Sequence, residues 1–140
     1  MSKRVLLTGV GGFIGAHVVQ WILQNTDWDL VGIESWKPEH VNSAKRLQDV
    51  LAPLTADQRR RFTVHRWDLT HEFTEPILRQ IFTKETDIII SMASDSRVTH
   101  SVNHPGETWF NNTQIAYNML ELARKHTPKM FIQVSTDEVY

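Results

Sequence analysis

The stretch from Val5 to Gly15, VLLTGVGGFIG, constrains the fold more than any other segment of the chain. Its opening apolar run predicts a short strand of a parallel sheet, with both faces of the strand buried. Gly9, Gly12 and Gly15 then predict a tight turn into a helix. One glycine would turn the chain, one would let the backbone approach a pyrophosphate, and one would pack the helix on the sheet. The free N–H groups at such a helix start form an anion site. A glycine-rich turn without a ligand is the alternative.

The composition is that of an ordinary globular protein. The 140 residues are 41% hydrophobic and 22% charged, which suits one domain or a part of a larger one. A net charge of −1 gives no electrostatic reason to expect nucleic acid or an anionic membrane as a partner. The chain contains no cysteine, which excludes disulfides and fits a cytoplasmic protein. No long apolar segment precedes the first strand, so we expect a cytoplasmic protein without a membrane partner.

Apolar runs alternate with amphipathic segments along the whole chain. Strands are expected at Arg4–Leu7, Asp29–Ile33, Phe62–Trp67, Asp87–Ala93 and Met130–Val134. Helical patterns lie between these runs, and this alternation is typical of α/β proteins. We therefore expect a Rossmann-type doubly wound parallel sheet with strand order 3-2-1-4-5, incomplete at one edge, with helices on both faces.

The periodicity of two helices predicts which of their residues are buried. The first helix, from about Phe13 to Gln24, is expected to bury Ile14, Val18, Trp21 and Ile22. The last helix, from about Glu107 to His126, is expected to bury Ile115, Ala116, Met119, Leu120 and Ala123. That helix also contains Asn111 and Asn112, whose amides compete for backbone hydrogen bonds. Two consecutive asparagines inside a helix indicate a specific use.

An acidic residue, Glu34, follows the second expected strand, about 20 positions after the third glycine. A carboxylate at this place can accept both ribose hydroxyls of an adenosine. It would also repel the additional phosphate of NADP, so NAD is the expected cofactor. A solvated acid at a strand end is the alternative.

The glycine pattern departs from the usual dinucleotide fingerprint, which would place glycines at positions 9, 11 and 14, because position 14 is Ile14. The observed pattern, T-G-x-x-G-F-I-G, resembles the extended short-chain dehydrogenase/reductase family, the NAD-dependent epimerases and dehydratases of nucleotide sugars. The resemblance implies that NAD is bound by the residues of this turn, which are Thr8, Gly9, Gly12, Phe13, Ile14 and Gly15.

The same resemblance extends to positions farther along the chain. It implies that Asp68 and Leu69 hold the edge of the adenine, and that Asn112 lies beside the cofactor. It also implies contacts with the nicotinamide ribose by the small residues Met92, Ala93 and Ser94, and with the sugar by Ser96. Three positions depart from the family pattern: Ser91 and Arg97 replace common histidines, and Ile115 replaces a glycine. The two replacements of histidine leave the choice of substrate open.

The chain ends with Ser-Thr-Asp-Glu-Val-Tyr, after the fifth expected strand. A hydroxyl and two carboxyl groups there can support acid–base chemistry if one carboxyl is protonated and the other ionised. A polar strand end that caps a helix is the alternative. The string resembles that of the nucleotide-sugar 4,6-dehydratases, the dTDP-glucose enzymes above all. This implies that Thr136 bonds the sugar 4-hydroxyl, that Asp137 is the acid for the departing 6-hydroxyl, and that Glu138 removes the C5 proton.

The expected function is therefore that of an NAD-dependent nucleotide-sugar 4,6-dehydratase, active as a homodimer. A Tyr-x-x-x-Lys pair, which the family uses for catalysis, does not occur in the sequence. We therefore expect residues 1–140 to be the N-terminal NAD-binding domain of a longer enzyme, inactive without its substrate-binding part. The alternatives are an epimerase or decarboxylase of the same family, a non-catalytic dinucleotide-binding module, and a regulatory subunit that binds no nucleotide.

His100 and His104 are four residues apart, which is a spacing found among metal ligands on a helix. No glutamate completes an H-E-x-x-H motif, and no cysteine is available. We therefore interpret both as ordinary polar histidines and expect no metal.

Overall fold

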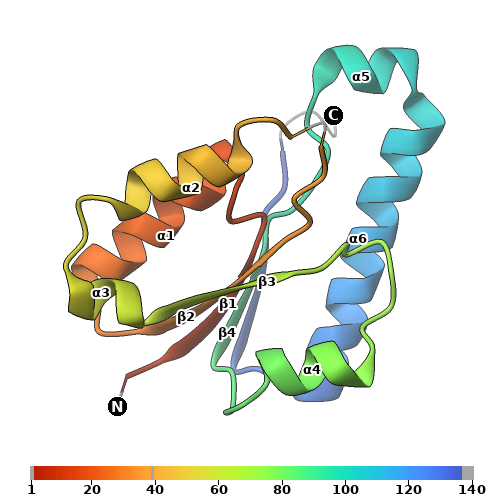
Figure 1. The fold of residues 1–140 in the computed structure, drawn as a ribbon. Coiled ribbons are helices and arrows are strands. Elements are labelled where there is room, and N and C mark those ends of the chain that lie inside the picture. The colour runs from red at the N-terminus through yellow and green to blue at the C-terminus, as the bar shows by residue number, and fades with distance from the viewer. Residues whose placement is uncertain (1, 39, 137–140) are drawn as a thin grey trace.

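The computed structural model describes residues 2–38 and 40–136 (Figure 1). In these residues the chain alternates strands and helices as the sequence predicts. The elements in chain order are β1 (Arg4–Thr8), α1 (Phe13–Asn25), β2 (Asp29–Glu34), α2 (Ser43–Leu51), α3 (Ala56–Arg60), β3 (Phe62–Arg66), α4 (Glu75–Ile81), β4 (Ile88–Ser91), α5 (Val98–Asn103), α6 (Pro105–His126) and β5 (Met130–Gln133).

The strands of the described residues form one five-stranded sheet in the order β3-β2-β1-β4-β5. Every neighbouring pair is parallel, so the predicted fold class and strand order are confirmed. In the central strand, Val5 is aligned with Leu30 of β2 on one side and with Ile88 of β4 on the other. The apolar run of β1 suits this place, because a central strand of a parallel sheet is covered on both faces.

Helices cover both faces of the sheet (Figure 1). Helices α1, α2 and α3 lie on one face, whereas α4 and α6 lie on the other. Successive side chains of β1 point to opposite faces, so Val5 and Leu7 join the core beneath α1 and α2, while Leu6 joins the core beneath α4 and α6. The sheet therefore separates two apolar layers.

The predicted buried face of α1 is wrong in part. Ile14 and Trp21 are 62% and 60% exposed. The helix instead buries Gly15, Ala16, Val19, Ile22 and Leu23. The reason is the close approach at Gly15, where an added Cβ would lie 2.0 Å from the carbonyl oxygen of Gly9. The small residues face the sheet, so Ile14 and Trp21 lie on the opposite side of the helix.

The predicted buried face of α6 is also wrong in part. Leu120 is 54% exposed, whereas Ile115 and Met119 are buried as expected. The residues that complete the buried stripe are Asn118 and Leu122. An asparagine can occupy this apolar stripe because its amide is hydrogen-bonded, as described below.

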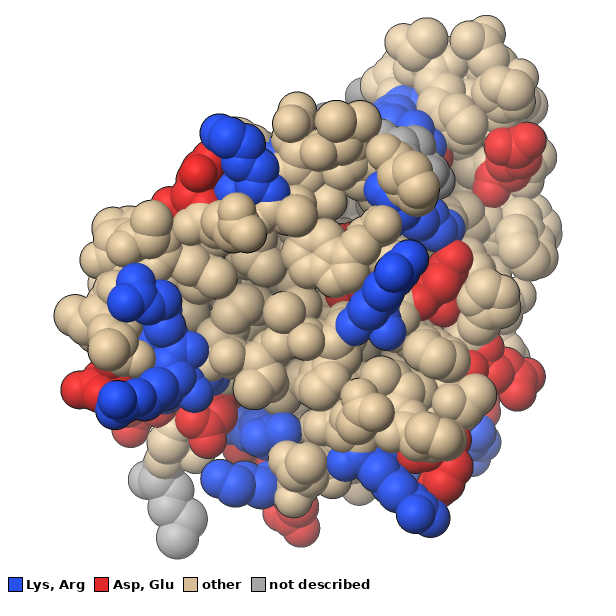
Figure 2. All heavy atoms as spheres, in the orientation of Figure 1, with Lys and Arg blue, Asp and Glu red and all other residues tan. Residues whose placement is uncertain are grey.

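The surface shown in Figure 2 carries basic and acidic side chains interspersed with neutral ones. This distribution agrees with the net charge of −1. Among the helices in the described part of the chain, none combines the length and the apolar character that crossing a membrane requires.

Candidate functional site

The polar segments singled out in the sequence converge at one edge of the sheet. The glycine turn follows β1, Glu34 ends β2, Asp68 follows β3, residues 92–97 follow β4, and Thr136 follows β5. The carboxyl ends of parallel strands all point to the same edge, and ligands of open α/β sheets bind there.

The glycine turn forms an open cradle at the start of α1. Gly9 has a φ of 74°, which favours glycine, and its carbonyl oxygen accepts the N–H of Gly12 at 3.0 Å. Gly12 is exposed, and a Cβ added there would meet Gly9 O at 3.1 Å as its nearest neighbour among the described atoms. Phe13 and Ile14, the first helical residues, are also exposed. The N–H groups at this helix start can therefore face an anion, with no side chain at Gly12 in the way.

Thr8 connects the ends of two neighbouring strands. It is completely buried, and its Oγ1 accepts the N–H groups of Met92 and Ala93, both at 3.0 Å. The hydroxyl thus holds the segment after β4 beside the glycine turn. A cofactor contact by Thr8 itself remains a prediction.

Glu34 lies beside the glycine turn. The residue is 7% exposed, and its Oε2 accepts the N–H of Gly11 at 2.8 Å, while Oε1 accepts the N–H of Ser35 at 2.9 Å. Arg46 of α2 donates from Nη1 to the carbonyl oxygen of Gly11 at 2.6 Å. The carboxylate is therefore held in one position next to the cradle, as a ribose-binding group would require.

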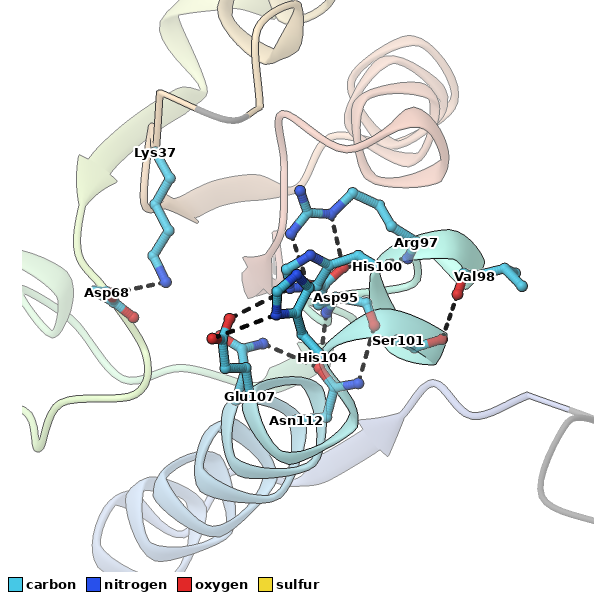
Figure 3. A network of polar contacts seen from close by, with 11 residues as sticks. Lys37, Asp68, Asp95, Arg97, Val98, His100, Ser101, His104, Glu107 and Asn112 are labelled. Atoms are coloured by element: carbon cyan, nitrogen blue, oxygen red, sulfur yellow. Dashed lines mark hydrogen bonds and ion pairs between the residues drawn. The ribbon is translucent and has the colours of Figure 1, made fainter.

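Asp68 and Leu69 form a turn after β3. Asp68 Oδ1 accepts the N–H of Thr70 at 3.0 Å, and Oδ2 is 3.0 Å from the ammonium of Lys37 (Figure 3). Burial acts to raise the pKa of Asp68, but the hydrogen bonds from Thr70 and Lys37 outweigh it and hold that pKa below its ordinary value. Leu69 is buried in the core beneath α6. The turn therefore carries an ionised carboxylate, at Asp68, next to a buried apolar side chain, at Leu69.

Asn112 holds the segment that follows β4. Its Oδ1 accepts the N–H of Asp95 at 2.7 Å, and its Nδ2 donates to the carbonyl oxygen of Asp95 at 3.0 Å. Asn111 also donates to Asn112 Oδ1, at 3.0 Å. The two asparagines thus have the specific use that their place in a helix indicated, which is to fix residue 95 on α6.

Ion pairs surround Asp95 in Figure 3. Arg97 donates from Nε and Nη2 to the two carboxylate oxygens at 2.9 and 2.8 Å, and His100 Nε2 lies 3.6 Å from Oδ2. Hydrogen bonds from Arg97 hold the pKa of Asp95 below its ordinary value, against the opposing effect of partial burial. The rings of His100 and His104 stack at 4.8 Å, and both histidines lie 3.7 Å from Glu107. Within residues 2–38 and 40–136, no cluster of three or more His, Cys, Asp or Glu side chains could hold a metal ion.

The remaining residues predicted for the site lie along the same edge. Met92 and Ala93 are half-buried, whereas Ser94, Ser96 and Thr136 are exposed. Asp137 and Glu138 lie outside the described residues. Ser91, at a position where a histidine is common in the resembled family, is completely buried at the end of β4. The catalytic and substrate-binding roles stay predictions.

Sequence reasoning missed Lys37, Asp95 and Asn118, which hold parts of this edge in place. Asn118 Nδ2 donates to the carbonyl oxygen of Leu69 at 2.7 Å. The signal that could have identified it is the one that identified Asn111 and Asn112, an asparagine inside a helix. Lys37 and Asp95 lie in loops, where charged residues are common and carry no such signal.

Comparison with known families and proteins gives consistent matches. The family model described as GDP-mannose 4,6 dehydratase matches residues 6–140. The dTDP-glucose 4,6-dehydratase of Salmonella typhimurium is 28% identical, and the alignment covers 98% of this chain and 38% of that enzyme. The UDP-glucose 4-epimerase of Pisum sativum is 29% identical, and the alignment covers 99% of this chain and 38% of the relative. The chain thus spans well under half the length of these relatives.

Solved structures agree with the fold. The UDP-Glc/GlcNAc 4-epimerase of Campylobacter jejuni matches with a TM-score of 0.77 and 23% identity, over 97% of this chain and 38% of that one. The UDP-glucuronic acid 4-epimerase of Bacillus cereus, solved with UDP-glucuronic acid and NAD, matches with a TM-score of 0.75 and 25% identity. That match covers 99% of this chain and 41% of the epimerase chain.

Proposed function

Because the chain belongs to the GDP-mannose 4,6 dehydratase family, we propose that it is the NAD-binding part of a nucleotide-sugar 4,6-dehydratase. The observation that carries the proposal is the pairing of the open cradle at Gly12 with the carboxylate of Glu34, which accepts the N–H of Gly11. A pyrophosphate at the helix start and a ribose at the carboxylate would then be neighbours, as they are in a dinucleotide. The B. cereus epimerase was solved with NAD, which supports the choice of cofactor.

The residues present fit an NAD molecule. Gly12 leaves the approach to the helix start open, and the buried Glu34 has its position fixed by the N–H groups of Gly11 and Ser35. Asp68 and Leu69 would hold the adenine, while Met92, Ala93, Ser94 and Asn112 would line the nicotinamide end. When bound, NAD supplies an acceptor for the hydride from C4 of the sugar and returns that hydride later.

The acid–base steps would use the residues after β5. Thr136 would hold the sugar 4-hydroxyl, and Ser96 would contact the sugar from the segment after β4. Glu138 would take the proton from C5 as the C6–O bond breaks, and Asp137 would give its proton to the departing hydroxyl, so that one water leaves. The two carboxyls must differ in protonation at the start of this step.

A 4-epimerase is the second candidate, because the relative from P. sativum is a UDP-glucose 4-epimerase with an identity close to that of the dehydratase. A decarboxylase of the same family and a non-catalytic NAD-binding module are further alternatives. Product analysis of the longer enzyme, with its substrate-binding part, separates them: a 4-keto-6-deoxy sugar from dTDP-glucose indicates a dehydratase and a 4-epimer an epimerase. Release of carbon dioxide from a nucleotide uronate indicates a decarboxylase, and NAD binding without turnover indicates a module.

We also propose that the enzyme is a cytoplasmic homodimer. Helix α6 has an outer face with the exposed side chains Trp109, Tyr117 and Leu120. Exposed apolar groups gathered on one helix are typical of a surface that another chain covers. Sedimentation at increasing protein concentration tests the dimer, and a monomer throughout would contradict it.

Calorimetric titration with NAD and NADP tests the cofactor assignment. We expect NAD to bind about tenfold more tightly or better, which corresponds to about 1.4 kcal/mol, because Glu34 would repel the additional phosphate. Equal affinities would contradict the role given to Glu34, and no binding of either would contradict the proposed function.

A further inference from the structure

We propose that Asn118 is a positioning residue for the adenine end of the dinucleotide site, an inference that rests on the proposed function. Asn118 contacts no part of the cradle itself. It acts through the turn at Asp68 and Leu69, which it attaches to helix α6. The class of ligand that this turn recognises is a purine with an exocyclic amino group.

The surroundings of Asn118 are unusual for an amide. The residue is 5% exposed and lies in the stripe of α6 that also buries Ile115, Met119 and Leu122. Burying an amide in such a layer is unfavourable unless its groups are hydrogen-bonded. Both groups are: Nδ2 donates to Leu69 O at 2.7 Å, and Oδ1 accepts from Gln114 Nε2 at 3.0 Å.

Polar contacts join the turn to β2, to Lys37 and to α6, and the contact with α6 connects two buried residues. The N–H of Trp67 donates to the carbonyl oxygen of Glu34 at 3.0 Å, which aligns the end of β3 with β2. The Lys37–Asp68 ion pair is partly open to solvent, with both side chains more than a quarter exposed. The hydrogen bond from Asn118 lies inside the protein and fixes the distance of the turn from α6. It therefore fixes the backbone of the turn that carries Asp68, whose carboxylate is oriented by Thr70 and Lys37.

A fixed carboxylate can select between purines. The 6-amino group of adenine donates to a carboxylate oxygen, whereas the 6-carbonyl of hypoxanthine places an acceptor against it. Such discrimination is lost when the recognising group shifts by about 0.5 Å or more. Without the bond to Asn118, the carbonyl of Leu69 loses its partner on α6. The backbone of the turn can then shift and carry the Asp68 carboxylate with it.

The test compares NAD with nicotinamide hypoxanthine dinucleotide, which differ in that one group. Asn118→Leu keeps the approximate volume of the side chain and the apolar layer but removes both hydrogen bonds. We expect its NAD affinity to fall by about tenfold and its preference for NAD over the hypoxanthine analogue to disappear. The matched control is Gln114→Ala, which keeps the bond to Leu69 and should keep the preference. Calorimetry of the whole chain measures both affinities.

A folded Asn118→Leu variant that retains the wild-type preference would overturn this inference alone. If Asn118→Leu does not fold, Asn118→Ala decides by the same comparison, because its side chain has no donor for Leu69 O, and a retained preference again overturns the inference. A wild-type chain that binds neither dinucleotide overturns the proposed function and this inference together. A general loss of stability, by contrast, would lower the affinities for NAD and for the hypoxanthine analogue equally. The ratio of the two affinities would then stay unchanged.

Discussion

The two ends of the candidate site are held in place by different kinds of contact. At the end with the glycine turn, buried and half-buried groups make direct hydrogen bonds: Glu34 to the N–H of Gly11, Arg46 to its carbonyl oxygen, and Asn118 to Leu69. At the end with α5, Asn112 binds the backbone of Asp95, but the side chain of Asp95 is held by ion pairs to Arg97 and His100. None of the six residues of α5 is buried.

This difference indicates a difference in adaptability. Hydrogen bonds between buried groups are insensitive to salt, whereas ion pairs near the surface contribute little and are screened. The glycine-turn end would thus present the same shape to every ligand. We expect the α5 end, where Ser96 would meet the sugar, to vary with the substrate. A family that acts on different sugars with one cofactor needs this combination.

Gly15→Ala would disrupt the packing of α1 against the glycine turn. An added Cβ would lie 2.0 Å from the carbonyl oxygen of Gly9, so the helix would have to move away from the turn. We expect the free energy of unfolding to fall by about 3 kcal/mol, measured by urea denaturation. Wild-type stability would show that α1 does not pack as described.

Gly12→Val would remove binding while leaving the fold intact. Gly12 has φ −66° and ψ 165°, which valine can adopt, and the nearest neighbour of its Cβ would be Gly9 O at 3.1 Å. We expect stability to stay within about 1 kcal/mol of wild type. NAD affinity should fall by about a hundredfold or more, because the side chain occupies the space of the pyrophosphate. A variant that binds NAD normally would show that this turn is not the cradle.

Glu34→Gln would alter selectivity rather than affinity. The amide oxygen can still accept the N–H of Gly11, so the glycine turn keeps that bond, while the N–H of Ser35 loses its carboxylate acceptor. The negative charge that repels a 2′-phosphate is lost, and the expected preference for NAD over NADP should shrink by about 1 kcal/mol. Parallel titrations of wild type and variant with both dinucleotides measure this change. An unchanged ratio would mean that another group selects the cofactor.

The smallest expected effect is at the other end of the site. The pKa of Asp95 is held below its ordinary value, so its ion pairs stabilise the native state above that ordinary value, about 3.9. This contribution is lost as the pH falls further, through the lowered native pKa. Asp95→Asn should thus cost at most about 1 kcal/mol near neutral pH and nothing at strongly acidic pH. Urea denaturation over a pH series tests this, and a difference that does not change with pH would contradict it.

The sheet and its order could be predicted because β1, β2, β4 and β5 are short apolar runs, β3 alternates apolar and polar residues, and helical patterns separate them. The cradle could be predicted because Gly9, Gly12 and Gly15 have spacings that follow from its mechanics. The buried face of α1 could not be predicted, because both sides of the helix carry apolar residues. Which side faces the sheet depends on the close packing of Gly15. Asn118 was missed because a polar residue is not expected in the buried stripe of a helix. Its hydrogen-bond partner, which makes the burial possible, lies 49 residues away in the sequence.

The place of β1 at the centre of the sheet has a consequence for the order in which the protein assembles. Arg4 is aligned with Asp29 on one side, but on the other its N–H reaches the carboxylate of Asp87, 83 residues away. Closing a longer loop costs more entropy, so the β1–α1–β2 unit should form before β4 and β5 join it. Pulse-labelled hydrogen exchange during refolding should show protection in β2 before β4, and the reverse order would contradict this. During synthesis, the cofactor cradle would then be complete while the strands that face the sugar have still to be translated.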